Sequence, residues 1–431
     1  MQTIADVRLS DGSAVDVVLD GERVVHVRPP GRRGLPDGGD VVDGGGGLLL
    51  PAFVDTHVHL DKAGIRDELD EAARYPGSDH PGDLAWAIAA THEAKRRYTV
   101  DGVRARARAV IEQHVLTGTT RLRSHVDVDG IGGLVPLQGV QAAARDCADI
   151  AEVRTIAFPQ EGILRDREAA GLMVAAMEAG ADVVGGMPHW ERDEAGQRRH
   201  VGFVFDLAAR FDADLDLHVD ETDDGDVRTL AMVVEETERR GWQGRVTVGH
   251  VCALAAADHA YAEDVMAGCA RAGLTVVANP VTNLVLQGRG DRGLVRRGTT
   301  RIRELLAAGV PVAFGQVCVD DGFYPFGRGD MLEVALVSAH AAHLTTTEEL
   351  GTLLAGVTDV PARAWHLGGD YGVRPGARAD LQLYAAPTWA DALRAQDPPV
   401  AVWHAGRLVA RSRITRELRP TGPGTGDPPR S

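Results

Sequence analysis

Residues 51–62, PAFVDTHVHLDK, decide the fold because they join an apolar run to a pair of histidines. Side chains alternate along a β-strand, so His57 and His59 point to the same side and can hold one metal ion between them. Two histidines at this spacing are common in ordinary strands, and the apolar run before them is what makes the pattern specific. The stretch therefore predicts a buried strand whose carboxyl end carries chemistry.

Eight apolar, β-rich runs follow one another from this stretch onward, and segments with helical periodicity separate most of them. The runs are GLLLPAFVDTHVHL, TTRLRSHVDV, IAEVRTIAF, ADVVGGM, DADLDLHVD, RVTVGH, GLTVVANP and GVPVAFGQV. Eight strands that alternate with helices are typical of a closed (β/α)8 TIM barrel, an α/β fold. An open doubly wound sheet is the alternative, but the Gly-rich fingerprint that such a sheet carries after its first strand is missing.

The two ends of the chain have a different pattern, with short alternating strands broken by Gly, Asp and Pro. AVDVVLDGERVVHVRP near the start and AVWHAGRLVARS near the end are examples. We expect residues 1–50 and 368–418 to form one small β-sandwich domain, and residues 51–367 to form the barrel. The tail, residues 419–431, is rich in Pro and Gly and is expected to be disordered.

Composition excludes several classes of function. The formal net charge of −16 argues against binding to nucleic acid or to anionic membranes, which needs a basic surface. The four cysteines, Cys147, Cys252, Cys269 and Cys318, have no paired spacing, and the N-terminus has no basic segment before an apolar run. We therefore expect a cytoplasmic protein that binds neither nucleic acid nor a membrane.

Further polar residues stand where the predicted strands end, which is where parallel barrels place their catalytic groups. His218 ends the fifth strand and Glu221 follows in the loop, while His250 ends the sixth strand. A third imidazole with a nearby carboxylate would supply a metal ligand and a proton shuttle. Taken singly, each has an ordinary explanation: Glu221 lies in an acidic run, residues 220–224, and a lone histidine at a strand end usually only hydrogen-bonds.

Six motifs taken together resemble the amidohydrolase superfamily, and most closely its cytosine deaminase-like branch, which includes triazine and other N-heterocycle aminohydrolases. The motifs are PAFVDTHVHLDK, FPQEG, HVDETDD, VGH, ANPVTNLVLQGR and FYPFG. The resemblance implies a distorted (β/α)8 barrel with a β-sandwich from both termini. It implies that His57, His59 and His218 hold one divalent metal ion, Zn or Fe. Glu221 would transfer protons, His250 would polarise the water or the adduct, and Gln160 would hydrogen-bond the heterocycle.

Residues 314–327, FGQVCVDDGFYPFG, depart from that family. The family carries a metal-binding aspartate where this chain has Val317, and valine neither ligates a metal nor accepts a proton. Three histidines alone can hold a catalytic zinc, or Cys318, Asp320 or Asp321 can substitute, although strand alternation directs Cys318 away from residue 317 unless a bulge intervenes. Two further hypotheses are a non-hydrolytic reaction (lyase, isomerase or cyclase) and a non-catalytic protein that binds a small molecule.

Aromatic residues near the predicted strand ends are candidates for the pocket wall. Trp190 follows the fourth strand and Phe323 the eighth, and with Gln160 and Cys318 they are the predicted substrate contacts. Asp127 at the end of the second strand is a further possible contact. We expect hydrolytic deamination of a small amino-substituted N-heterocycle, and the acidic run 220–224 favours a neutral or cationic one. The chain is a possible homo-oligomer, as its relatives in the superfamily commonly are.

Overall fold

The computed structural model describes residues 1–31, 40–79 and 83–418, and contains two sheets. The larger sheet has eight parallel strands in chain order, as the sequence predicts. These are β5 (Phe53–Val58), β6 (Thr119–Asp127), β7 (Glu152–Phe158), β8 (Val183–Gly186), β9 (Asp214–Val219), β10 (Val246–His250), β11 (Thr275–Ala278) and β12 (Val312–Phe314). The prediction of a (β/α)8 barrel is thereby confirmed.

The first and last strands of the barrel meet at one short seam. Val58 and Val317 form an isolated parallel bridge, in which the Val317 N–H donates to the His57 carbonyl at 2.7 Å and the His59 N–H donates to the Val317 carbonyl at 2.8 Å. The last strand, β12, ends at Phe314, so residue 317 closes the ring from the loop beyond it. The barrel is therefore joined at the residue that departs from the family motif.

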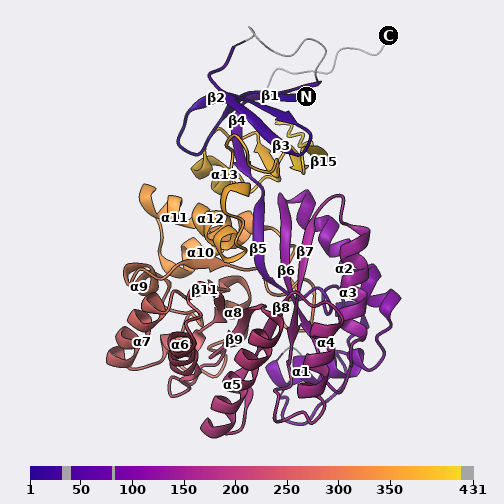
Figure 1. The fold of residues 1–431 in the computed structure, drawn as a ribbon, viewed down its shortest axis with the longest axis vertical. Coiled ribbons are helices and arrows are strands. Elements are labelled where there is room, and N and C mark those ends of the chain that lie inside the picture. Colours follow the sequence, from indigo (N-terminus) through magenta and orange to yellow (C-terminus); the bar gives the residue numbers. More distant parts are fainter. Residues whose placement is uncertain (32–39, 80–82, 419–431) are drawn as a thin grey trace, which may run out of the picture.

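Helices surround the barrel and fill the connections between its strands (Figure 1). They are α1 (Leu84–Lys95), α2 (Val100–Leu116), α3 (Val135–Asp146), α4 (Ala169–Glu178), α5 (Glu194–Phe211), α6 (Thr229–Arg240), α7 (His259–Arg271), α8 (Pro280–Leu286), α9 (Ile302–Ala307), α10 (Met331–Ala342), α11 (Thr347–Val357), α12 (Asp359–Ala364) and α13 (Trp389–Ala395). Side-chain caps start several of them: Asp193 accepts a hydrogen bond at the start of α5, and Thr346 and Glu349 form a capping box at α11.

Strands from both ends of the chain form the second sheet, and Figure 1 shows them together at one pole of the molecule. Its order is β15-β14-β13-β4-β1-β2-β3, in which β4 pairs parallel to β1 and antiparallel to β13. The strands are β1 (Gln2–Arg8), β2 (Ala14–Asp20), β3 (Arg23–Arg28), β4 (Asp40–Pro51), β13 (Leu381–Tyr384), β14 (Ala401–His404) and β15 (Arg407–Arg411). The predicted small β-structure from both termini is thus present as a seven-stranded mixed sheet.

The small sheet has its own apolar core and a polar link to the barrel. Ile4, Val17, Leu381 and Trp403 belong to that core and are fully buried. At the link, buried Arg121 of β6 lies 2.6 Å from Asp380, which precedes β13. The predicted domain limits, 1–50 with 368–418 and 51–367, stay predictions, and the tail 419–431 lies outside the described residues. None of the helices in the described part of the chain is long and apolar enough to cross a membrane.

Candidate active site

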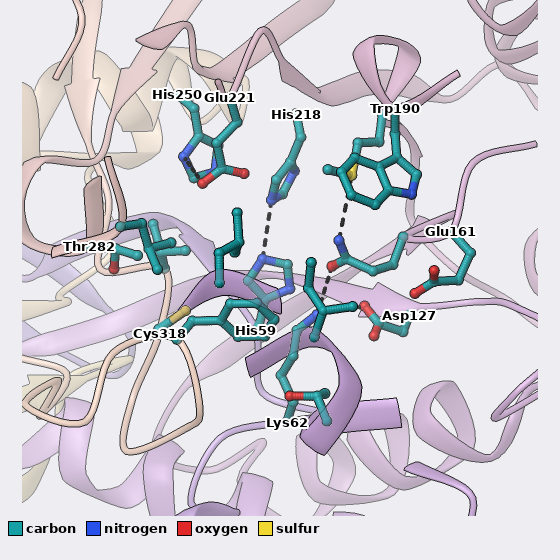
Figure 2. A pocket seen from close by; sticks show the side chains of 18 of the residues that line it. His59, Lys62, Asp127, Glu161, Trp190, His218, Glu221, His250, Thr282 and Cys318 are labelled. Carbon is teal, nitrogen blue, oxygen red and sulfur yellow. Dashed lines mark hydrogen bonds and ion pairs between the residues drawn. The ribbon is translucent and has the colours of Figure 1, made fainter. Parts of the chain in front are cut away.

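Most of the predicted site residues come together in one pocket at the carboxyl ends of the barrel strands (Figure 2). His59 follows β5, His218 lies on β9, and His250 is the last residue of β10. Helix α1 covers one side of the pocket. The lining includes Glu221 and all four predicted substrate contacts, which are Gln160, Trp190, Cys318 and Phe323.

Four imidazoles meet at the base of this pocket, and we call His57, His59, His218 and His250 the imidazole cluster. The Nε2 atom of His218 lies 3.2 Å from the Nε2 atoms of both His57 and His59. The Nε2 atom of His250 lies 3.2 Å from that of His57. All four side chains are at most 3 % exposed. Histidines from three different strand ends therefore place their Nε2 atoms close together.

The imidazole cluster fits a metal cation. Burial lowers the pKa of His57, His59 and His218 well below the usual value, and neighbouring imidazoles lower it further. Each ring is therefore neutral and offers one nitrogen lone pair, and three such nitrogens cannot all satisfy one another by hydrogen bonds. Zinc is held by three histidines in some catalytic sites. A single divalent ion among these Nε2 atoms would satisfy all three rings.

Two glycines make room for the His57 ring of the cluster. A Cβ atom at Gly249 of β10 would lie 2.6 Å from Cε1 of His57. A Cβ atom at Gly315, just after β12, would lie 2.7 Å from Cβ of His57. Real Cβ contacts are essentially never this short, so any larger residue at either position would displace His57 from the cluster.

Glu221 and His250 form a pair beside the cluster. An Oε1 atom of Glu221 lies 3.0 Å from Nδ1 of His250 and accepts a hydrogen bond from the Asn283 amide at 3.3 Å. Because the carboxylate accepts the Nδ1 proton of His250, the Nε2 lone pair of that ring faces His57. Burial would raise the pKa of Glu221, but the facing His250 lowers it below the ordinary value. Glu221 is thus an ionised carboxylate at the pocket wall, placed to accept a proton.

Val317 occupies the pocket wall with a left-handed backbone, at φ 65°. A β-branched residue is unfavourable in this region, which Asn and Asp tolerate better. The left-handed turn also breaks the strand alternation, and Cys318 lines the same pocket as Val317. Regular strand alternation would direct these two side chains apart, and the exception left open for a break in the strand applies, because residue 317 lies beyond β12.

Of the candidate substitute ligands, Cys318 lines the pocket, and the two aspartates lie elsewhere. Asp320 is exposed. The Oδ1 atom of Asp321 accepts hydrogen bonds from the N–H groups of Phe323 at 2.9 Å and Tyr324 at 2.8 Å, so this carboxylate holds the following turn together. Among the described residues, neither aspartate belongs to a group of side chains close enough to share a metal ion.

A buried lysine–aspartate network, consisting of Asp61, Lys62, Lys95, Asp127 and Asp129, adjoins the imidazole cluster at His59 and contributes to the pocket wall. Asp127 contacts both lysines, at 2.8 Å from Lys62 and 2.6 Å from Lys95, and Lys95 also lies 2.6 Å from Asp129. Sequence reasoning missed this network apart from Asp127. The signal that marks it is composition, since Lys62 and Lys95 are the only lysines among 431 residues.

Comparison with known proteins gives one family and several relatives. The model of the amidohydrolase family matches residues 82–410. A pterin deaminase of Rhizobium rhizogenes is 30 % identical over 410 residues, which are 95 % of this chain and 88 % of the relative. An N-isopropylammelide isopropyl amidohydrolase of Pseudomonas sp. is 26 % identical over 414 residues, covering 93 % and 95 %.

A solved structure resembles the whole molecule. The 5-methylcytosine deaminase from Klebsiella pneumoniae, in complex with 5-fluorocytosine, superimposes with a TM-score of 0.90 at 32 % sequence identity. The match covers 97 % of this chain and 100 % of that one. The similarity thus extends over the barrel and the terminal sheet alike.

Proposed function

Since this chain belongs to the amidohydrolase family, we propose that it is a metal-dependent hydrolase that deaminates a small amino-substituted N-heterocycle. The relatives named above act on such rings and span nearly the full chain. The imidazole cluster and the ionised Glu221 beside it support a hydrolytic C–N cleavage of this kind.

In this proposal His57, His59 and His218 hold one divalent ion, Zn or Fe. Such an ion would lower the pKa of water and polarise the carbon under attack. Glu221 takes a proton from the attacking water and returns it to the departing amine, with the ring nitrogen as an intermediate stop. His250, fixed through its Nδ1 by Glu221, contacts the water or the adduct through Nε2. Gln160, Trp190, Cys318 and Phe323 surround the ring of the substrate.

The observation that carries the proposal is the 3.2 Å approach of Nε2 of His218 to those of both His57 and His59. The test combines elemental analysis of the purified protein with ammonia release from a panel of aminopyrimidines, aminotriazines and pterins. We expect about one divalent ion per chain and turnover of at least one ring class. A protein that takes up no divalent ion when it is supplied would contradict the proposal.

Val317 favours a second candidate, a non-hydrolytic reaction such as a lyase, isomerase or cyclase reaction, because the family's metal-binding aspartate is missing there. The two candidates differ in what Val317→Asp does. If the chain is a hydrolase that works without this carboxylate, the native protein releases ammonia and the variant changes the rate. If deamination appears only in Val317→Asp, while the native protein binds metal but releases no ammonia, the second candidate is favoured.

A further inference from the structure

The wall of the candidate active site near Trp190 is built from two loops. The loop after β8, residues 187–193, carries Met187 and Trp190, and it contacts the loop after β7, residues 159–168. Figure 2 shows Trp190 across the pocket from Cys318. Neither loop belongs to a strand or to an α-helix, so their positions depend on their own turns and on side-chain contacts.

A buried carboxylate joins these two loops. Glu191 lies in the loop after β8, and its Oε1 atom accepts hydrogen bonds from the N–H groups of Ile163 at 2.7 Å and Leu164 at 3.0 Å. The same atom lies 2.8 Å from Nδ1 of His200 on α5. Gly162 has a left-handed backbone at φ 81° and leaves room for this arrangement, because a Cβ atom there would lie 3.1 Å from Oε1 of Glu191. One carboxylate therefore holds the loop after β7 to the loop after β8 and to α5.

The tautomer of His200 follows from its two partners. The backbone N–H of Met187 donates to Nε2 of His200 at 3.0 Å, so Nε2 carries the lone pair. The ring proton is then on Nδ1, which donates it to Glu191. Both ring nitrogens are used, and the side chains of His200 and Glu191 are at most 1 % exposed. His200 therefore fixes the loop after β8 at two points, Met187 and Glu191.

Burial acts on both members of this pair. It lowers the pKa of His200, and the facing carboxylate offsets this only in part, so the ring stays neutral. Burial would raise the pKa of Glu191, but the hydrogen bonds from His200 and from the two N–H groups lower it below the ordinary value. Buried charged pairs contribute little to stability, and apolar side chains of similar volume often serve as well. The pair therefore fits a role in positioning better than a role in stability.

Trp190 rests on the loop that this pair holds. Arg165 of the loop after β7 donates a hydrogen bond to the Trp190 carbonyl at 2.8 Å. The guanidinium carbon of Arg165 also lies 4.6 Å from the centre of the indole ring, which is an attractive cation–π distance. Trp190 is next to Glu191 in the chain and contacts Arg165 in space, so a shift of either loop would move the indole.

We propose that Glu191 and His200 are positioning residues that hold Met187 and Trp190 as a fixed wall against the flat ring of a bound heterocycle. This rests on the proposed deaminase function. Both residues lie behind the side chains that line the pocket, so they act through the wall. An indole and a thioether offer apolar surface to a flat ring. A wall that is fixed in advance spares the entropy cost of ordering it when the ring binds.

Hydrogen exchange of the purified protein tests whether Glu191 holds the loops. Glu191→Met keeps the length of the side chain and removes the acceptor, and we expect the amides of Ile163 and Leu164 to exchange at least about 10-fold faster than in the native protein. Glu191→Gln keeps one oxygen for these bonds, so the increase should be about 3-fold or less. Mass spectrometry of peptides that cover residues 159–168 measures both. Native exchange rates in Glu191→Met would overturn the inference.

His200→Asn separates the two contacts of the imidazole. The Asn amide nitrogen takes the place of Nδ1 and still donates to Glu191, but nothing replaces Nε2. We therefore expect the amide of Met187 to exchange about 10-fold faster while the loop after β7 stays protected. His404→Asn is the matched control, because that imidazole is also buried and lies 3.2 Å from Asp380 beside the small sheet. An equal increase in the control would show a general loss of stability and refute the assignment.

Steady-state kinetics test what the wall does for the substrate. For whichever ring of the panel is turned over, we expect Glu191→Met to raise KM at least about 10-fold, with kcat within about 3-fold and the metal content unchanged. A change of this kind marks weaker binding of the ring and intact chemistry. His200→Asn should raise KM by about 3-fold, which keeps the test open if Glu191→Met fails to fold. Native KM values in both variants, or loss of the metal, would overturn the positioning role.

A measurement without substrate separates this inference from the proposed function. Acrylamide quenching of tryptophan fluorescence, compared with and without Trp190→Phe, gives the accessibility of the Trp190 indole. We expect this quenching to rise about 2-fold or more in Glu191→Met and to stay at the native level in His404→Asn. If it does and no compound of the panel is deaminated, the proposed function fails and the wall assignment stands. If compounds are deaminated with native KM values in Glu191→Met, the function stands and the wall assignment fails.

Discussion

The two sides of the pocket are equally buried but differ in charge. The imidazole cluster lies on β5, β9 and β10, where burial lowers the pKa of His57, His59 and His218 and leaves neutral rings. In the lysine–aspartate network, burial acts against the ammonium of Lys62 in the same way, but facing carboxylates outweigh it. The same low dielectric thus leaves neutral rings in the imidazole cluster and ion pairs in the lysine–aspartate network.

The difference shows what each side needs from outside the chain. The lysine–aspartate network supplies its own counter-charges. In the imidazole cluster the ring nitrogens approach one another at 3.2 Å, an arrangement that fits a bound cation. Mutations should therefore act differently on the two sides, through loss of metal on one and through disturbed ion pairs on the other.

Replacing His218 should have the largest effect on metal binding and turnover. His218 is the ring whose Nε2 atom meets those of both His57 and His59. In His218→Asn we expect loss of the bound ion and a fall in turnover of more than about 10⁴-fold, because the ion supplies several kcal/mol of transition-state stabilisation. Elemental analysis and ammonia release measure the two effects. His340→Asn, on an exposed position of α10, is the control. A variant that keeps its metal would contradict the assignment of His218.

Glu221→Gln should separate proton transfer from metal binding. The amide keeps the shape of the side chain but cannot accept the proton, and we expect kcat to fall about 10³-fold with the metal content unchanged. Metal content and kcat measured on the same preparation check this. If the metal is lost along with the activity, Glu221 is instead a ligand.

A substitution in β10, which lies close to His57, should reduce metal affinity less than the replacement of His218. In Gly249→Ala the new Cβ atom would start 2.6 Å from Cε1 of His57 and push the ring out of the cluster. We expect metal affinity to fall about 10- to 100-fold, the range found when the support of a metal ligand is disturbed. Competition with a chelator of known affinity measures it. Gly171→Ala on α4, where a Cβ atom meets nothing within 4 Å, should leave the affinity unchanged.

The neutral state of the cluster predicts how the metal-free protein responds to acid. Below a pH of about 6.5 the unfolded chain protonates its histidines, while the folded chain holds His57, His59 and His218 neutral. The unfolded state then binds more protons, so the free energy of unfolding is full above this pH and falls below it, by up to about 1.4 kcal/mol per pH unit for each ring. Urea denaturation at several pH values measures the slope, which should be shallower in His218→Asn. A flat profile would show that the rings are not held neutral.

Much of this fold can be predicted from local sequence patterns. Each of the eight strands was expected from a short apolar run, and the metal-ligand candidates from their places at strand ends. The strand predictions are confirmed, and the candidate ligands lie close together because in a parallel barrel the carboxyl end of every strand reaches the same rim. A local sequence pattern is therefore enough to predict which residues lie close together, because the barrel topology brings all strand ends to one rim.

The features that sequence reasoning missed depend on contacts between distant residues. Lys62 stands in the quoted motif, but its partners Asp127 and Gln160 are 65 and 98 residues away. Strand alternation alone does not give the direction of Cys318, because the left-handed backbone at Val317 cannot be read from the residue types. A β-branched residue is among those least expected in that conformation.

At Val317 the main chain closes the barrel, while the side chain faces the pocket. The ring is fastened there by main-chain groups, Val317 N–H to the His57 carbonyl and His59 N–H to the Val317 carbonyl, which every amino acid except proline can provide. The side chain at this position is therefore free to change without opening the barrel. A lineage can replace a reactive group at the centre of its catalytic machinery and still inherit the scaffold intact, which makes this position an accessible point for new reactions to evolve.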